Sequence, residues 1–180
     1  MNSMISLLKT VKPEEANDLV KDVYKGFSEK MGKVPNVIQF HTASQKVYGY
    51  LMGMFNDFSM HPTIDPVLQA YLRVIISHRE GGEYCVEFQS FLLQAYGVSN
   101  EEIKLVLEDP ENVRIDEKQK QLLLFALRLI EGSPGNTSED LHKLHNLGWS
   151  DREIYEMCFL GGGQKGMIPL VKGFEVEHDF

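Results

Sequence analysis

Two apolar helical segments, separated by one glycine pair, occur in Leu72-Arg-Val-Ile-Ile-Ser-His-Arg-Glu-Gly-Gly-Glu-Tyr-Cys-Val-Glu-Phe-Gln89. The first segment begins upstream, where Asp65 and Pro66 are residue types that cap a helix and occupy its first position. Its apolar side chains recur at helical spacing, at Leu68, Leu72, Ile75 and Ile76. After Gly81-Gly82 the same spacing resumes at Tyr84, Cys85, Phe88, Phe91, Leu92 and Ala95. These are the most hydrophobic helices of the chain, and they predict a central helical hairpin over about residues 65–97.

Helical spacing also dominates the sequence on both sides of this hairpin, and sustained alternation of apolar and polar residues is scarce. A turn device occurs twice, at Gly97–Ile103 and Gly148–Ile154, where a glycine ends one helix and a serine with a following glutamate caps the next. Further helices are expected at about 13–31, 37–40, 44–58, 116–131, from 137, and from 150 to near 161. The sequence therefore predicts an all-α, single-domain helical bundle spanning residues 1–180.

The composition is that of an ordinary globular protein with an acidic surface. The 180 residues include 18 Lys and Arg against 26 Asp and Glu, which gives a formal net charge of −8. An acidic chain without a basic stripe is a poor candidate for nucleic acid or anionic membranes. No apolar run reaches the length of a membrane span, and we expect no signal peptide. With only two cysteines, a disulfide scaffold is not expected, and we predict a cytoplasmic protein.

Cys85 has the side chain of the hairpin that is best suited to covalent chemistry. It falls in the first turn of the second helix, where the helix dipole lowers the pKa of a thiol and raises its thiolate fraction. His78 lies seven residues earlier and is placed to approach it across the hairpin. The alternative is that Cys85 is a small buried apolar residue, as free cysteines usually are.

Several segments together resemble the core of the carboxymuconolactone decarboxylase / alkylhydroperoxidase D-like family, and in particular its peroxidase-related branch. The resemblance rests on Asp65-Pro66, Ile75-Ile76-Ser77, Gly82-Glu-Tyr-Cys-Val86 and Ala95-Tyr-Gly-Val-Ser-Asn-Glu-Glu-Ile103. It implies an alkylhydroperoxidase D-like helical fold and an antioxidant oxidoreductase with peroxiredoxin activity. It also implies a homo-oligomer, a trimer or a hexamer, that acts on a small molecule.

The redox site that the resemblance implies is only partly present. The peroxidase-type members have a glutamate, a C-x-x-C pair and a histidine, which together cycle a disulfide and move protons. These four positions fall on Ala70, Gly82, Cys85 and Gln89, so one of the four is kept. The resemblance therefore implies at most one-cysteine chemistry at Cys85, with His78, Glu83 and Gln89 as the remaining candidate catalytic side chains.

The sequence leaves more than one function open. The first is peroxide reduction through the Cys85 thiol. The alternatives are a non-redox member of the same fold, either a carboxymuconolactone decarboxylase-like small-molecule enzyme or a catalytically inactive ligand-binding oligomer. We expect no cofactor and no bound metal in any of these cases.

Three further motifs carry weaker signals. Cys158 is either a resolving partner for Cys85 or a core cysteine. Gly161–Gly166 matches G-x-G-x-x-G but lacks the strand, helix and acidic residue of a dinucleotide site, so we interpret its glycines as close-packing positions or a pocket wall. His142 and His145 have metal-ligand spacing without an evident third ligand, so a solvated helix face is favoured.

Overall fold

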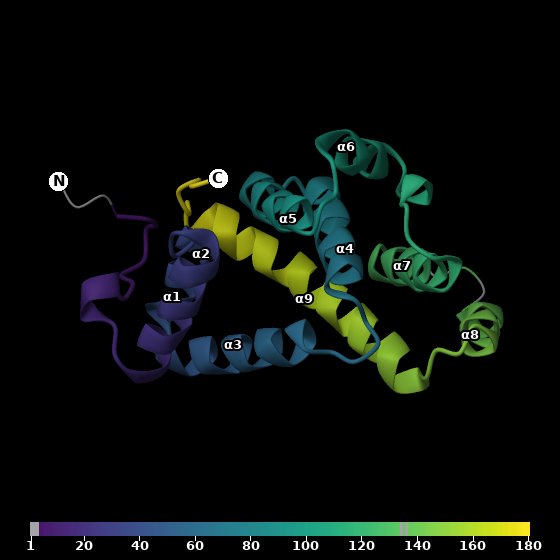
Figure 1. The fold of residues 1–180 in the computed structure, drawn as a ribbon, viewed down its shortest axis with the longest axis horizontal. Coiled ribbons are helices and arrows are strands. Elements are labelled where there is room, and N and C mark those ends of the chain that lie inside the picture. Colours follow the sequence, from purple (N-terminus) through teal and green to yellow (C-terminus); the bar gives the residue numbers. More distant parts are fainter. Residues whose placement is uncertain (1–3, 134, 136) are drawn as a thin grey trace. The chain divides into compact units, whose positions relative to one another are not determined.

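All regular structure in the described part of the chain is helical, as predicted. The computed structural model describes residues 4–133, 135 and 137–180 (Figure 1). Its α-helices are α1 (Asp18–Met31), α2 (Asn36–Phe40), α3 (Gln45–Ser59), α4 (Pro66–Arg79), α5 (Glu83–Ala95), α6 (Asn100–Glu108), α7 (Glu117–Ile130), α8 (Thr137–Asn146) and α9 (Asp151–Gly173). Short 3-10 turns occur at Pro13–Glu15, His41–Ala43 and Pro110–Asn112. The described residues form two compact units, His61–Pro169 and the segment up to Met60 with Leu170–Phe180.

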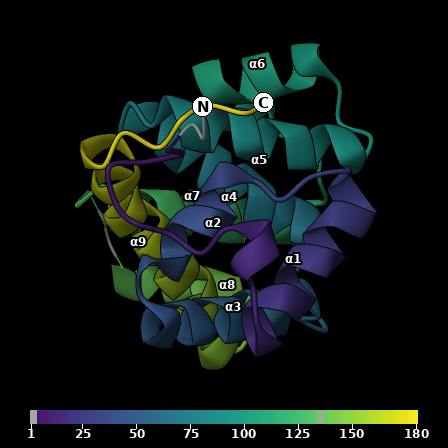
Figure 2. The ribbon, with the colours of Figure 1, turned by 90° about the vertical axis from the view of Figure 1, so that its left-hand side faces the viewer.

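The helices α4 and α5 form the predicted hairpin. The Asp65 carboxylate accepts a hydrogen bond from the Val67 backbone N–H at 2.7 Å, which caps α4. Gly81 takes a left-handed φ of 63°, and the Gly82 N–H donates to the Ser77 carbonyl at 2.8 Å, which ends α4. In Figures 1 and 2, α6 lies beside this hairpin, with contacts to both of its helices.

The repeated turn device caps the helix that follows it in both copies. Ser99 accepts a hydrogen bond from the Glu102 N–H at 3.2 Å, and Ser150 accepts one from the Glu153 N–H at 3.3 Å. In the second copy the Glu153 carboxylate also accepts from the Ser150 N–H at 2.8 Å, which completes a capping box. In the first copy the Glu102 carboxylate instead accepts a hydrogen bond from the Tyr71 hydroxyl at 2.8 Å.

The last helix is longer than predicted. We expected it to run to near Gly161 and left open that it resumes after the glycines, whereas α9 continues without a break through the glycine run to Gly173 and includes Pro169. Gly161 is buried, and a Cβ atom there would meet side-chain atoms of Leu72, Ile76 and Ile130. Glycine is therefore used at this position for close packing of α9 on α4 and α7, which agrees with the close-packing interpretation of this segment.

The unit that contains both chain ends is held by backbone pairing near those ends. The Leu7 N–H donates to the Phe174 carbonyl at 2.9 Å, and the Glu177 N–H donates to the Ile5 carbonyl at 2.9 Å. The Asp179 carboxylate lies 3.2 Å from the Lys33 ammonium. One prediction fails here: Pro13–Glu15 is a separate 3-10 turn, and α1 begins after it, at Asp18.

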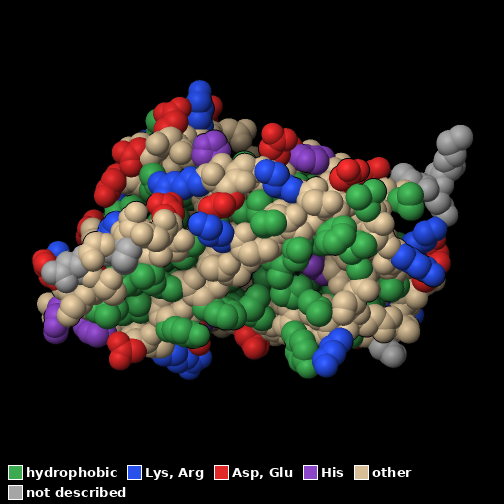
Figure 3. Space-filling model, turned by 180° about the vertical axis from the view of Figure 1, so that it is seen from behind, with side chains coloured by type: hydrophobic (Ala, Val, Ile, Leu, Met, Phe, Trp, Pro, Cys, Tyr) green, Lys and Arg blue, Asp and Glu red, His purple; other side chains and the backbone are tan. Residues whose placement is uncertain are grey.

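The distribution of charged side chains on the surface matches a sequence without a basic stripe. On the face shown in Figure 3, Lys and Arg side chains are scattered among acidic ones and do not form one continuous basic stripe. Within the described residues, none of the helices combines the length and the apolar character that crossing a membrane would require.

Candidate functional site

Cys85 is buried in the first turn of α5. Its exposed fraction is 6%, and burial raises the pKa of its thiol from an ordinary 9.0 to about 11. The helix-dipole argument from the sequence predicted a lowered pKa. That prediction is wrong in direction, because the loss of water around the thiolate raises the pKa more than a hydrogen bond from Gln164 lowers it. At neutral pH this cysteine is a neutral thiol.

A short chain of hydrogen bonds connects the thiol to α4 through a side chain of α9. The Gln164 amide hydrogen-bonds the Cys85 thiol, which lowers the pKa of the thiol but does not overcome burial. Gln164 Nε2 also donates to Ser77 Oγ at 3.0 Å, and that hydroxyl donates to the Arg73 carbonyl at 2.7 Å. Three uncharged polar groups from α4, α5 and α9 therefore meet at this point.

Gln89 lies one helical turn after Cys85, on the same side of α5. Its exposed fraction is 4%, and its Oε1 atom has no hydrogen-bond partner. An unpaired buried acceptor is unusual in a folded protein, because the lost water contacts are not replaced. Gln89 is therefore the most distinctive polar group of the hairpin.

The position of the missing first thiol is filled by a neighbouring side chain. A Cβ atom on Gly82 would stand 2.9 Å from Ile168 Cγ2 and 3.2 Å from Ile168 Cγ1. Both atoms are attached directly to the Cβ of a residue that is 1% exposed, so they cannot swing aside like the end of a long side chain. A cysteine at this position requires Ile168 to shift. Ala70, at the glutamate position, is also buried.

His78 and Glu83 flank the hairpin turn and are exposed. Of the described residues, Gln164 and not His78 supplies the hydrogen bond to the thiol. The structure thus places Cys85 and Gln89 together in the buried part of the hairpin and leaves His78 and Glu83 at its solvent-facing end. Their catalytic roles stay predictions.

Sequence reasoning missed Gln164, Ser77 and Ile168 as parts of the site. Ser77 was noted only within a family-like segment, and Gln164 lies in the glycine-rich segment that we interpreted as a close-packing region or a pocket wall. The one signal that could have identified Gln164 is its polar amide side chain within a segment made mostly of glycines.

The other motifs do not join this site. Cys158 is a free cysteine in α9, and burial raises the pKa of its thiol to about 11. His145 Nε2 lies 2.8 Å from an Asp151 carboxylate oxygen. Within the part of the chain that the structure describes, no three His, Cys, Asp or Glu side chains gather as metal ligands.

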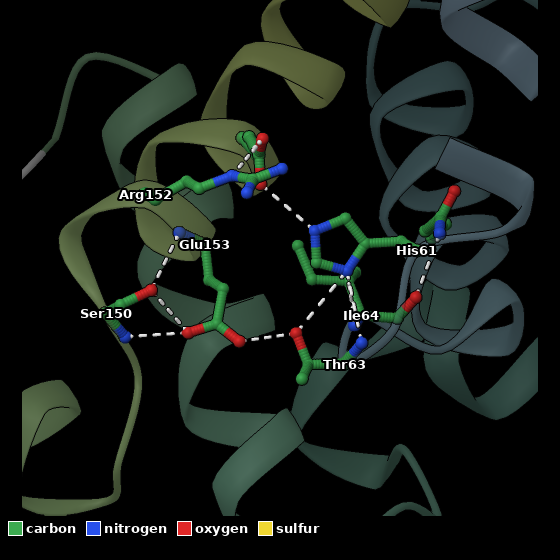
Figure 4. Close-up of polar contacts among 8 residues, drawn as sticks. His61, Thr63, Ile64, Ser150, Arg152 and Glu153 are labelled. Carbon is green, nitrogen blue, oxygen red and sulfur yellow. Dashed lines mark hydrogen bonds and ion pairs between the residues drawn. The ribbon is translucent and has the colours of Figure 1, made fainter. Parts of the chain in front are cut away.

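A second polar cluster connects the loop before α4 to the first turns of α9 (Figure 4). His61 Nδ1 accepts hydrogen bonds from the Ile64 N–H at 2.9 Å and the Thr63 N–H at 3.2 Å. The proton is therefore on Nε2, which lies 3.0 Å from a Glu156 carboxylate oxygen. The other Glu156 oxygen is 2.9 Å from Arg152 Nε. Since both ring nitrogens of His61 are engaged, we interpret this cluster as a structural clamp. No local pattern of residues predicts this cluster.

Glu153 joins the clamp by accepting a hydrogen bond from the Thr63 hydroxyl, and its carboxyl gives the clamp a measurable pH dependence. Burial alone would raise the pKa of its carboxyl, but hydrogen bonds from Ser150 and Thr63 outweigh this effect and lower the pKa from an ordinary 4.5 to about 2. Because the folded pKa is below the unfolded one, the carboxylate stabilises the fold above pH 4.5, and this contribution is lost as the pH falls towards 2.

We expect Glu153→Gln to lower the free energy of unfolding by about 1–2 kcal/mol at pH 7, a figure reduced for the carboxylate's partial exposure to solvent. At pH 3 the loss should fall to less than half of that value. Urea denaturation at both pH values measures it. Glu108→Gln, at an exposed position of α6, is the matched control, and equal losses for Glu153→Gln at the two pH values would contradict the assignment.

Comparison with protein-family models and with curated proteins gives no match for this chain. Solved structures do match. An uncharacterized peroxidase-related protein with an alkylhydroperoxidase AhpD core, from Ralstonia eutropha JMP134, aligns with a TM-score of 0.83 at 17% identity, over 98% of this chain and 94% of that one. An uncharacterized peroxidase-related protein from Silicibacter sp. TM1040 aligns with a TM-score of 0.77 at 16% identity, over 94% and 92%.

The debrominase Bmp8 also aligns, with a TM-score of 0.73 at 16% identity, over 99% of this chain and 93% of that one. At these identities the likeness shows a shared fold. The AhpD-like helical fold that the sequence resemblance implied is therefore confirmed, and the function has to be argued from this chain's own site.

Proposed function

We propose that this protein is a non-redox member of the AhpD-like fold that binds a small molecule at the hairpin site formed by Ser77, Cys85, Gln89 and Gln164. The observation that carries the proposal is the burial of Cys85 as a neutral thiol. Its neighbours are uncharged hydrogen-bonding groups, and such groups orient a ligand.

The chemistry of a two-thiol cycle does not fit this site. Disulfide formation needs a thiolate and a second thiol within reach. With a pKa of about 11, only about one thiol in ten thousand is ionised at pH 7. The space that a first thiol at position 82 would need is occupied by Ile168. Ser77, Gln89 and Gln164 also lack a group that acts as a base at neutral pH, which favours binding over proton transfer.

One observation favours a second function, peroxide reduction by a single cysteine. The Gln164 amide hydrogen-bonds the Cys85 thiol and lowers its pKa against the effect of burial. In that reaction the thiolate sulfur attacks a peroxide oxygen, an S–O bond forms and the O–O bond breaks. The products are a sulfenic acid and an alkoxide that takes up a proton, and an external thiol then reduces the sulfenic acid. The names of the peroxidase-related fold neighbours agree with this alternative.

Peroxide consumption in the presence of dithiothreitol distinguishes the two functions. We expect the wild-type protein to consume hydrogen peroxide and cumene hydroperoxide no faster than Cys85→Ser, because so little thiolate is present. Cys158→Ser is the control for the other free thiol. Turnover that is present in wild type and Cys158→Ser but lost in Cys85→Ser would overturn the proposal and establish the one-cysteine peroxidase.

A further inference from the structure

We propose that the ligand of the hairpin site is an uncharged molecule that carries an O–H or N–H group and donates it to Gln89 Oε1. This inference rests on the proposed function, because it names the class of molecule that the site binds. Alcohols, phenols and primary or secondary amides belong to this class.

The first support is the state of the Gln89 side chain. It is 4% exposed, and Oε1 is an acceptor without a partner. Leaving such a group buried and unpaired costs stability that a residue of the same size without polar atoms would not cost. A ligand that donates a hydrogen bond removes this cost when it binds, which makes Gln89 a binding group and not a structural one.

The second support is a comparison with another buried glutamine in the same unit. Gln69 of α4 is also 4% exposed, but its Nε2 donates to the Ile64 carbonyl at 3.0 Å. That hydrogen bond connects α4 to the loop before it. Gln69 is thus tied to the backbone by a side-chain hydrogen bond, whereas the buried Gln89 Oε1 has no hydrogen-bond partner.

The third support is the charge of the surrounding groups. Cys85, Ser77 and Gln164 are all uncharged, and the Gln164 amide is already hydrogen-bonded to the other two. A carboxylate ligand has no O–H or N–H to donate to Gln89 Oε1, and Cys85, Ser77 and Gln164 offer it no positive charge in return for its lost water. A cation would lose its water without gaining a negative partner among them. The site therefore selects a neutral donor over an ion.

Two matched variants separate a binding role from a structural role. Gln89→Leu removes the unpaired acceptor, and we expect it to raise the Tm by about 3 °C. Gln69→Leu removes a paired side chain, and we expect it to lower the Tm and leave ligand binding unchanged. A lowered Tm for Gln89→Leu would show that its amide stabilises the fold, and would overturn the inference.

Fluorinated probes test the ligand class by ¹⁹F NMR. The donors are 4-fluorophenol and 2,2,2-trifluoroethanol, and the matched molecules without a donor are 4-fluoroanisole and 4-fluorobenzoate. We expect the donors to bind wild type and Gln69→Leu at millimolar concentration, and Gln89→Leu about tenfold more weakly. We expect 4-fluoroanisole and 4-fluorobenzoate to bind wild type about tenfold more weakly than 4-fluorophenol.

Equal binding of 4-fluorophenol and 4-fluoroanisole, or no binding of either donor, would overturn the inference. This result is independent of peroxide turnover. A Cys85-dependent peroxidase with a Gln89-dependent donor preference would overturn only the proposed function, and an inactive thiol with no donor preference would overturn only the ligand class.

Discussion

Gly82→Ala is expected to lower the free energy of unfolding by about 2 kcal/mol. The added Cβ atom would stand 2.9 Å from Ile168 Cγ2 and 3.4 Å from the Ser77 carbonyl oxygen. Ile168 is β-branched and 1% exposed, so relief requires a shift of the α5 start or of α9. The gain in helix propensity from alanine is small at this position, because Gly82 is the N-cap of α5 and not part of its interior.

A double-mutant cycle identifies Ile168 as the cause. In an Ile168→Ala background the same Gly82→Ala change should cost less than half as much, since the two Ile168 atoms nearest to the new Cβ are gone and only the Ser77 carbonyl oxygen, at 3.4 Å, remains. Urea denaturation of the four proteins measures the coupling. An equal cost of Gly82→Ala in both backgrounds would show that the backbone of the turn, and not Ile168, excludes a side chain.

The sequence predicts the hairpin because its signals are local. Asp65 and Pro66 start α4, and Gly81 takes the left-handed φ that the turn requires. The end of α9 was mispredicted because glycine in a helix usually weakens it. At Gly161 that cost is offset by close contact with side chains of α4 and α7, and such contacts depend on tertiary packing that no local pattern reports.

In the candidate site, too, some residues could be predicted from the local sequence, and others are brought in only by tertiary packing. Helical spacing places Cys85 and Gln89 on one side of α5, and the structure has both of them buried. Gln164 and Ile168 come from a helix that begins more than sixty residues later, so their contacts with the hairpin appear only once α9 is packed against it. The thiol pKa was mispredicted for a related reason: helix position is local, but burial is a tertiary property.

The likeness to peroxidase-related structures shows the fold, and the non-redox chemistry that we propose is argued from this chain's own residues. The fold is shared at 16–18% identity. In this chain the positions that correspond to the redox residues hold a buried alanine, a glycine packed against Ile168 and a glutamine with an unpaired carbonyl oxygen. None of these three residues carries an ionisable side chain, and the hydrogen bond to the Cys85 thiol comes from Gln164 of α9.

The second large effect concerns that thiol. Burial raises the pKa of Cys85 from 9.0 to about 11, so the thiolate fraction near pH 7.5 is about one hundredth of that of a free cysteine. We expect Cys85 in the folded protein to react with iodoacetamide at least about 100-fold more slowly than in the protein unfolded in urea. Limited access to the buried sulfur slows the reaction further, and for this reason the pH midpoint is more informative than the rate.

The measurement that tests the central claim most directly is the pH dependence of Cys85 alkylation in Cys158→Ser protein, with circular dichroism confirming the fold at each pH. The structure predicts a rate that rises steadily through the alkaline range, with a midpoint near pH 11. A midpoint at or below the free-cysteine value of about 8.5 in the folded protein would contradict the neutral, non-redox site and identify Cys85 as an activated thiolate.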